Sequence, residues 1–269
     1  MIRLAAVGKL HLEICGIWDM ADSEILFLHV VCYKWGTLYP ASEVNILKAM
    51  VDRNLTVPHA FHCITDDPSG LSSGIVVHEL PELPGFYKKL YAYSDDFLGL
   101  KGQTVAVLDI DLVILDNIDF LAAEPGWKFM VARDARDDAR THTAVFRLEV
   151  GSHSEVWEAY VRDPEGAEKI LPHRLDRDQA WAEVFVKDIG YFPRGKIVSF
   201  KYDCRSESHR IFGKVGAKLG LTTAHFGNAE PPNGAAIVSF HGQPLPRDVR
   251  DRRFLHYRRA PFVEQCWRA

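Results

Sequence analysis

Residues 106–114, AVLDIDLVI, constrain the fold of this chain more than any other stretch. The stretch opens with a short apolar run that is typical of a strand buried on both faces of a sheet. Two carboxylates, Asp109 and Asp111, then follow with one residue between them. Because burying an unpaired carboxylate costs several kcal/mol, such a pair beside a core strand needs a counter-charge. The carboxyl ends of strands in an open α/β sheet bind ligands, so the pair predicts a site for a hard divalent cation that binds phosphate oxygens.

A D-x-D pair alone is more typical of a polar turn than of a metal site. Asp176 and Asp178 form a second such pair, in a polar setting. The pair at Asp109 and Asp111 differs from it in the apolar run before it and in the motifs on either side. We therefore base the cation site on this context and not on the two residues by themselves.

Composition places the chain among soluble globular proteins. Of its 269 residues, 47% are hydrophobic and 25% are charged, and the net charge of −4 gives no sign of bulk nucleic-acid binding. The five cysteines are odd in number and lack C-x-x-C spacing, which argues against a disulfide framework and a zinc site. No apolar run approaches the roughly 18–20 residues that span a bilayer. We expect a cytoplasmic protein.

Residues 1–19 are expected to be an extension that the fold does not need. Lys9, His11 and Glu13 interrupt the apolar residues there, which is not the pattern of a signal peptide. Met20 stands just before the first strong strand and would make a natural start.

The order of the expected elements is typical of a mostly parallel α/β sheet. In the first half it is strand, helix, strand, strand, helix, strand, and the second half is more mixed. Ser42 is the expected N-cap of the first helix. No repeat or linker interrupts the pattern, so one domain at 20–246 is expected. Beside the central strand, the expected strands are 24–32, 59–64, 75–80, 127–132, 143–148, 197–200 and 236–240, and the expected helices are 40–54, 86–100, 154–162 and 178–187.

Two other strand ends in the first half carry unusual residues. Lys34, Trp35 and Gly36 follow the first strand, and Asp66 and Asp67 follow the second. If these strands are parallel neighbours, their ends share one edge of the sheet with the D-x-D pair. An aromatic there can stack on a base, and a glycine lets a ligand approach the backbone. Each group alone is more typical of a core aromatic or a turn, but their coincidence at strand ends favours a nucleotide site.

Two further candidates come from the second half. His241 follows the run AAIVSF and precedes Gly242, so it is either a hydrogen-bonded, half-buried residue or a metal ligand. One imidazole beside two carboxylates would favour manganese over magnesium. Asp178 and Gln179 open a helix, where an aspartate is an ordinary capping residue.

The segment 247–269 is basic, with aromatic residues among its arginines. A solvated basic tail is the default interpretation, and contact with anionic phosphate groups or a membrane surface is the alternative. The arginines in question are Arg247, Arg250, Arg252, Arg253, Arg258 and Arg259.

Seven motifs occur in order along the chain: VVCYKWGTLYP, FHCITDDPSG, YKKLYAYS, VLDIDLVILDNIDFL, DRDQAW, IVSFKYDC and IVSFHGQPLP. Together they resemble the bacterial branch of nucleotide-sugar glycosyltransferases of the GT-A fold, related to the glycogenin and lipopolysaccharide galactosyltransferase family. The resemblance covers residues 25–246. It implies a single Rossmann-like GT-A domain, with a mostly parallel central sheet and a smaller mixed region on the acceptor side.

The resemblance also implies an activity. The chain would transfer a hexose, with retention at the anomeric carbon, from a nucleotide-diphosphate sugar such as a UDP-sugar to a hydroxyl acceptor in glycan or lipopolysaccharide assembly. The acceptor would be a sugar, a lipid-linked glycan or a protein. No nucleic acid partner is implied, and the basic segment would allow peripheral contact with the inner face of the membrane.

The resemblance assigns roles to individual residues. Manganese, or magnesium, would be bound by Asp109, Asp111 and His241. The nucleotide and its diphosphate would contact Cys32, Lys34, Gly36, Asp66 or Asp67, Lys88 and Gly242. The transferred sugar and the acceptor hydroxyl would lie near Asp178 and Gln179.

Two departures from the family pattern stand out. The late motif usually continues from His and Gly to Lys-Pro-Trp, whereas here Gln243, Pro244 and Leu245 follow, so one lysine contact to the diphosphate is missing. An Asn-Ser-Ser-like stretch is replaced by residues 141–143, Thr-His-Thr. The identity of the sugar therefore stays open.

Two alternative functions remain open at this point. AVLDIDLVI also resembles the first motif of haloacid-dehalogenase-type phosphatases, in which Asp109 would be the nucleophile and Asp111 the acid and base. Val113 stands where that family has Thr or Ser, and a long α/β region precedes the motif. The other alternative is a non-catalytic nucleotide-sugar binder.

Overall fold

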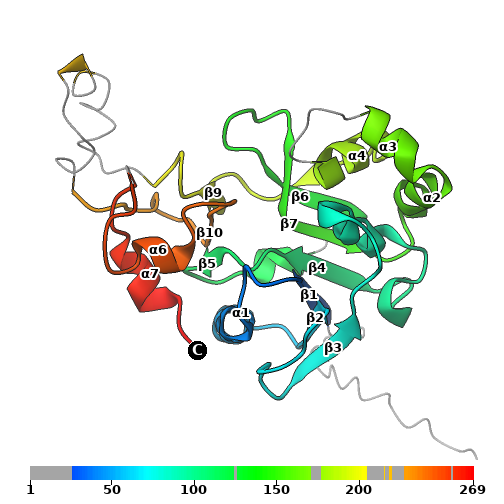
Figure 1. Cartoon of the computed structure of the whole chain (residues 1–269), viewed down its shortest axis with the longest axis horizontal. Coiled ribbons are helices and arrows are strands. Elements are labelled where there is room, and N and C mark those ends of the chain that lie inside the picture. Colours follow the sequence, from blue (N-terminus) through cyan, green and yellow to red (C-terminus); the bar gives the residue numbers. More distant parts are fainter. Residues whose placement is uncertain are drawn as a thin grey trace, which may run out of the picture.

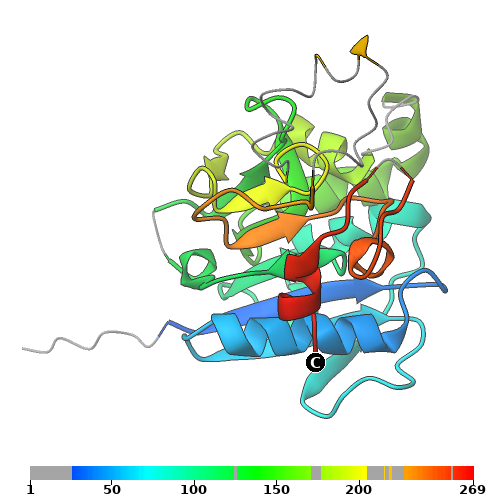
Figure 2. The ribbon, with the colours of Figure 1, turned by 90° about the vertical axis from the view of Figure 1, so that its left-hand side faces the viewer.

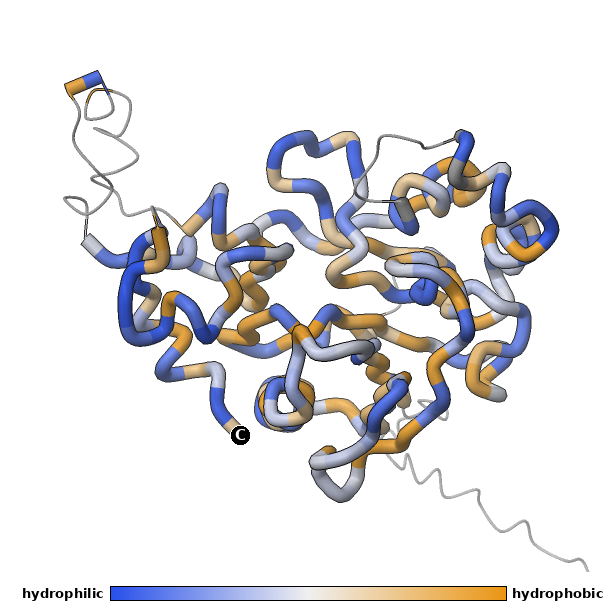
Figure 3. The backbone as a smooth tube through the Cα atoms, in the orientation of Figure 1, coloured by the Kyte–Doolittle hydropathy of each residue, from blue (hydrophilic) through white to orange (hydrophobic). Residues whose placement is uncertain are grey.

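The computed structural model describes residues 26–123, 126–170, 177–204, 215, 218–219, 227–255 and 257–269. The expected extension at 1–19 and the expected strand start at residue 24 lie outside these residues, as does Asp176. The described part contains two sheets, whose strands are labelled in Figure 1. Two hydrophobic cores pack against them. Figure 3 shows the apolar positions gathered along the strands in the middle of the molecule.

Seven strands form the larger sheet, in the order β3 (Ile75–Glu79), β2 (His59–Thr65), β1 (Leu28–Lys34), β4 (Thr104–Leu108), β7 (Thr141–Glu149), β6 (Phe129–Arg133) and β8 (Gly190–Tyr191). Neighbours among β3, β2, β1 and β4 are parallel. β7 is antiparallel to β4 and β6, and β8 is parallel to β6. The expected α/β fold with a mostly parallel central sheet is confirmed.

A smaller mixed sheet stands beside the larger one. Its order is β5 (Leu112–Ile114), β10 (Ile237–Ser239) and β9 (Ile197–Ser199), with β10 antiparallel to β5 and parallel to β9. Since β4 ends before Asp109 and β5 begins after Asp111, the chain passes from one sheet to the other between these strands. The two carboxylates therefore lie at the crossing between the sheets.

The helix α1 (Ala41–Asn54) covers one face of the larger sheet (Figure 2). The expected N-cap at Ser42 is wrong. Pro40 is the N-cap, extended at φ −69° and ψ 158°, and no side chain caps the helix. Proline is pre-organised for a helix start, so the helix begins directly after it and Ser42 falls within the first turn. Among the buried residues of this first core are Val44, Leu47, Met50 and Val51 from α1 and Leu28, Val30 and Cys32 from β1.

The second core lies on the other face of the sheet. It is formed by η1 (Gly85–Tyr93), η2 (Phe97–Gly99), α2 (Ser154–Arg162), α3 (Pro164–Ile170) and α4 (Arg177–Phe185). The expectation of one helix at 86–100 is wrong, because two 3₁₀ segments replace it. Ser94, Asp95 and Asp96 separate them, and these residue types favour caps and turns over helix interiors.

The segment 247–269 includes all of α7 (Pro261–Cys266) and most of α6 (Pro246–Val249), which begins one residue before the segment. Val263 and Trp267 belong to the first core. Arg247 forms an ion pair of 2.5 Å with the buried Glu43 of α1. This segment, described above as a basic tail, therefore packs on the core through its apolar residues. None of the described helices combines the length and the apolar character that a bilayer crossing needs.

Candidate active site

Asp111 is held where the two sheets meet. Its backbone carbonyl accepts a hydrogen bond from the N–H of Phe240 at 3.1 Å, and its Oδ2 accepts one from the N–H of Gly242, also at 3.1 Å. The side chain is buried, and Tyr39 also hydrogen-bonds to it. Burial, reinforced by the charge of Asp109, raises the pKa of Asp111 to about 6. Its negative charge is therefore only partly compensated within the chain.

Lys89 supplies the counter-charge that the sequence requires beside this pair. Its Nζ lies 2.5 Å from Oδ1 of Asp109. Burial acts to lower the pKa of Lys89, but the carboxylates of Asp109, Asp178 and Asp111 raise it overall, so the side chain stays charged. Lys88, which the resemblance implies as a contact of the nucleotide diphosphate, donates from its Nζ to the carbonyl of Leu83.

The sequence signal for Lys89 is weak but present. Two adjacent lysines stand in an otherwise apolar segment, and Tyr87, Leu90 and Tyr93 of η1 are buried beside Lys89. A buried carboxylate pair calls for one buried cation, which one of the two lysines can provide. Only the orientation of η1 identifies which one.

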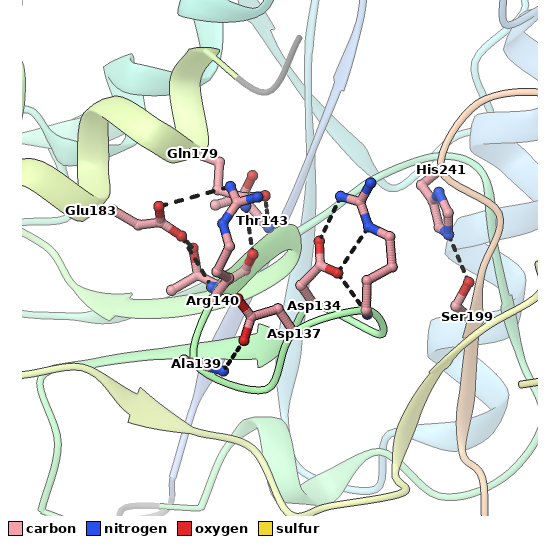
Figure 4. Close-up of polar contacts among 11 residues, drawn as sticks. Asp134, Asp137, Ala139, Arg140, Thr143, Gln179, Glu183, Ser199 and His241 are labelled. Carbon is pink, nitrogen blue, oxygen red and sulfur yellow. Dashed lines mark hydrogen bonds and ion pairs between the residues drawn. The ribbon is translucent and has the colours of Figure 1, made fainter. Parts of the chain in front are cut away.

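Asp178 and Gln179 come to the same centre from α4. Both are buried, and the side chain of Gln179 points toward Thr143 on β7 (Figure 4). The N–H of Thr143 donates to Oε1 of Gln179 at 3.3 Å, and its hydroxyl donates to Oδ2 of Asp178 at 3.5 Å. Burial raises the pKa of Asp178; Lys89 opposes this shift and Asp109 reinforces it. The D-Q pair and the D-x-D pair therefore interact through Lys89.

The ends of β1 and β2 meet as expected. The N–H of Gly36 donates to Oδ2 of Asp66 at 2.9 Å, and Nζ of Lys34 donates to the carbonyl of Asp67 at 3.1 Å. The positive φ of Gly36, 61°, is a conformation that glycine adopts without strain. Cys32 is fully buried in the first core, so its side chain is not available to a ligand.

His241 directly precedes Gly242, which bonds to Asp111, but the ring of His241 makes its hydrogen bond elsewhere. Its Nε2 is 2.7 Å from the hydroxyl oxygen of Ser199, and its ring stacks parallel to Tyr202, with 6.0 Å between ring centroids (Figure 4 shows the Ser199 contact). Burial, with the charges of His142 and Lys201, lowers the pKa of His241 to about 4, so the ring is neutral near pH 7. Among the described residues, no three His, Cys, Asp or Glu side chains are arranged to hold a metal ion.

A cavity of about 480 Å³ opens beside His241. Its wall includes His142, Lys201 and the loop after β6, where Asp134 pairs with Arg136 (Figure 4). Lys201 donates to the carbonyl of His241 at 3.0 Å. None of the residues of the D-x-D and D-Q pairs lines this cavity. His241 and Lys201 lie between the cavity and the centre that those pairs form.

This fold is similar to that of solved glycosyltransferases. The galactosyltransferase LgtC, solved in complex with donor and acceptor sugar analogs, matches with a TM-score of 0.57 and 11% sequence identity, over 88% of this chain and 94% of LgtC. GlyE of Streptococcus pneumoniae matches with a TM-score of 0.53 and 10% identity, over 81% of this chain. The chain has a glycosyltransferase fold.

The expected GT-A-like architecture is thus confirmed, and at these identities the similarity concerns the fold. The chain spans only 56% of the length of GlyE. An LgtC variant that is altered at an active-site glutamine also matches, with a TM-score of 0.53 and 12% identity, over 81% of this chain and 89% of the variant. No protein-family model matches the sequence, and no match was found among curated proteins.

Proposed function

We propose that the protein is a metal-dependent glycosyltransferase. It moves a hexose, with retention of configuration, from a nucleotide-diphosphate sugar, a UDP-sugar by preference, to a hydroxyl of an acceptor in glycan assembly. The observation that carries the proposal is the convergence of four side chains at the crossing between two sheets of a glycosyltransferase fold. These side chains are Lys89, Asp109, Asp111 and Asp178.

The D-x-D carboxylates have the donor chemistry of a divalent cation site. Carboxylate oxygens are hard ligands that suit magnesium or manganese. Asp111 is buried without a full counter-charge, so a cation there would relieve an unfavourable burial. His241 would join as a third ligand only after its ring turns away from Ser199. When bound, such a cation neutralises charge on the departing nucleotide diphosphate.

The nucleotide would lie across the ends of β1 and β2. Asp66 is held by the backbone of Gly36, which leaves its other carboxylate oxygen for a ribose hydroxyl or a base N–H. Lys34 is buried with its ammonium at the same edge and adds positive charge for the diphosphate. Cys32 lines this region from the core, so its role is to support the loop by packing.

Asp178 and Gln179 would hold the hydroxyls of the transferred sugar. LgtC also has a glutamine in its active site, and here Gln179 is positioned by Thr143 and by the carbonyl of Thr141. The acceptor would enter the cavity beside His241. Its volume of about 480 Å³ lies in the usual range for small-ligand sites, and its wall is polar enough to bind a sugar.

The residues of the chain would favour the reaction mainly by stabilising the leaving group. Lys89 and Lys34 place positive charge where the diphosphate gains negative charge, in a region that excludes water. Asp178, buried and close to Lys89, would orient the sugar and stabilise positive charge at its anomeric carbon. The pair Asp178 and Gln179 also positions the acceptor hydroxyl.

The test is a screen of the purified protein against UDP-, GDP- and ADP-sugars with and without Mn²⁺. We expect one donor to raise the melting temperature in the presence of Mn²⁺ and to release its nucleoside diphosphate. Asp109→Asn should abolish this release, whereas Asp116→Asn, an exposed neighbour, should not. Release of phosphate from a simple phosphomonoester would favour the phosphatase instead, and donor binding without turnover would favour a non-catalytic binder.

A further inference from the structure

Lys89 occupies a position that a metal ion at Asp109 would need. Its Nζ is 2.5 Å from Oδ1, and the Lys89 side chain is only 10% exposed. An oxygen that accepts a short hydrogen bond from an ammonium is a poor ligand for a second cation, because the two positive charges would repel at close range. One of the two D-x-D carboxylates is therefore already neutralised from within the chain.

Lys89 lies close to two further carboxylates of the same centre. Asp111 and Asp178 are the other carboxylates whose charges act on it, and both are buried. An ammonium released from Asp109 would remain in a water-poor region and would need a new anion there. In the proposed reaction, that anion would be the diphosphate of the donor, which offers several oxygens to an ammonium.

We infer that Lys89 is an internal counterion, which gives up Asp109 to a divalent cation only when the diphosphate of the donor binds its ammonium. This inference rests on the proposed function. It has a thermodynamic consequence, because metal and nucleoside diphosphate then bind cooperatively, each weakly alone and tightly together. The free protein would thereby keep Asp109 neutralised without metal.

Lys101 provides a control outside the proposed site. It has the same side chain, but it is exposed and its Nζ pairs with Asp95 at 2.6 Å. A general effect of removing one positive charge from the protein would appear in both variants. A specific effect on Asp109 would appear only in Lys89→Met, which keeps an unbranched apolar stem and removes the ammonium.

The experiment measures binding of Mn²⁺ by calorimetry, with and without the nucleoside diphosphate (UDP, GDP or ADP) that raises the melting temperature of the protein most. In the wild type we expect Mn²⁺ to bind at least about tenfold more weakly without nucleotide. In Lys89→Met we expect Mn²⁺ alone to bind about tenfold more tightly than in the wild type, with the coupling to nucleotide lost. Lys101→Met should behave like the wild type.

A second measurement uses thermal stability. Without metal, Lys89→Met leaves three carboxylates close together without their ammonium, so it should melt lower, and Mn²⁺ alone should restore it more than it stabilises the wild type. Unchanged or weaker Mn²⁺ binding in Lys89→Met would overturn the inference, and so would independent binding of metal and nucleotide in the wild type. The test for independent binding uses only the wild type, so its outcome does not depend on whether a variant folds. Failure of the wild type to bind Mn²⁺ with any of the nucleotides would overturn the proposed function as well.

Discussion

The backbone N–H of Gly242 donates a hydrogen bond to Oδ2 of Asp111 at 3.1 Å, across 131 residues of sequence. β10 and β5 are antiparallel neighbours, so the chain after β10 returns to the residue that precedes β5. This pairing brings the late His-Gly motif to the D-x-D motif. It also means that the position of Asp111 depends on both sheets.

Asp111→Asn should remove most of the metal-dependent donor binding. Asparagine keeps the shape and can still accept from Gly242, but it lacks the charge that binds a cation. Calorimetry with Mn²⁺ and nucleotide should show a loss of at least about tenfold. The metal-free protein should melt at the same temperature or higher, because a buried charge and its repulsion with Asp109 are gone. Asp116→Asn is the control, and a clear drop in melting temperature of the metal-free Asp111→Asn would contradict this account.

His241→Ala should weaken Mn²⁺ binding less than either aspartate change. The ring bonds to Ser199 and not to the carboxylates, and water can replace an imidazole ligand. Ser199→Ala frees the ring without removing it, so it should leave Mn²⁺ affinity unchanged or increase it. The idea fails if His241→Ala is as damaging as Asp111→Asn in the same calorimetric assay.

A row of histidines should make the fold sensitive to acid. Nδ1 of His29 lies 2.9 Å from Nε2 of His62, and Nδ1 of His62 lies 3.0 Å from Nε2 of His78. Burial, with the charges of His29 and His78, lowers the pKa of His62 from 6.5 to about 4. Between these values the unfolded chain binds more protons than the folded one, so stability falls as the pH drops from about 6.5 to about 4.

Melting curves over this pH range test the prediction. His62→Gln should lose less stability on acidification than the wild type. In a domain of this size, each kcal/mol of unfolding free energy corresponds to about 2–4 °C of melting temperature. Equal acid sensitivity in His62→Gln and the wild type would show that other groups control it.

Replacing Arg250, Arg252 and Arg253 by alanine should leave nucleotide-sugar affinity within about twofold, because exposed charges contribute little to distant sites. All three are exposed, and Arg250 pairs with Asp251 at 3.1 Å. Their expected role is contact with the acceptor or with anionic lipid, so binding to anionic vesicles is the second readout. A collapse of donor affinity in the calorimetric titration would instead assign this segment to the diphosphate.

Local patterns in the sequence determined the elements that depend mainly on neighbouring residues. The helix expected at 154–162 has the same bounds as α2, and the apolar run before Asp109 forms the end of β4. The placement of polar residues from the first strands at one edge of the sheet also followed, because parallel strands bring their carboxyl ends to one edge. These features depend on periods of two or 3.6 residues, which can be counted along the chain.

Tertiary structure alone decided which candidate side chains meet. In a 3₁₀ segment adjacent residues point about 120° apart, so the packing of η1 on the sheet, and not composition, turns Lys89 to Asp109 and Lys88 to Leu83. The ring of His241 follows Ser199, which comes from a strand more than 40 residues earlier. Such contacts depend on how the two sheets and their helices pack together. A local period in the sequence does not encode contacts between elements that lie far apart along the chain.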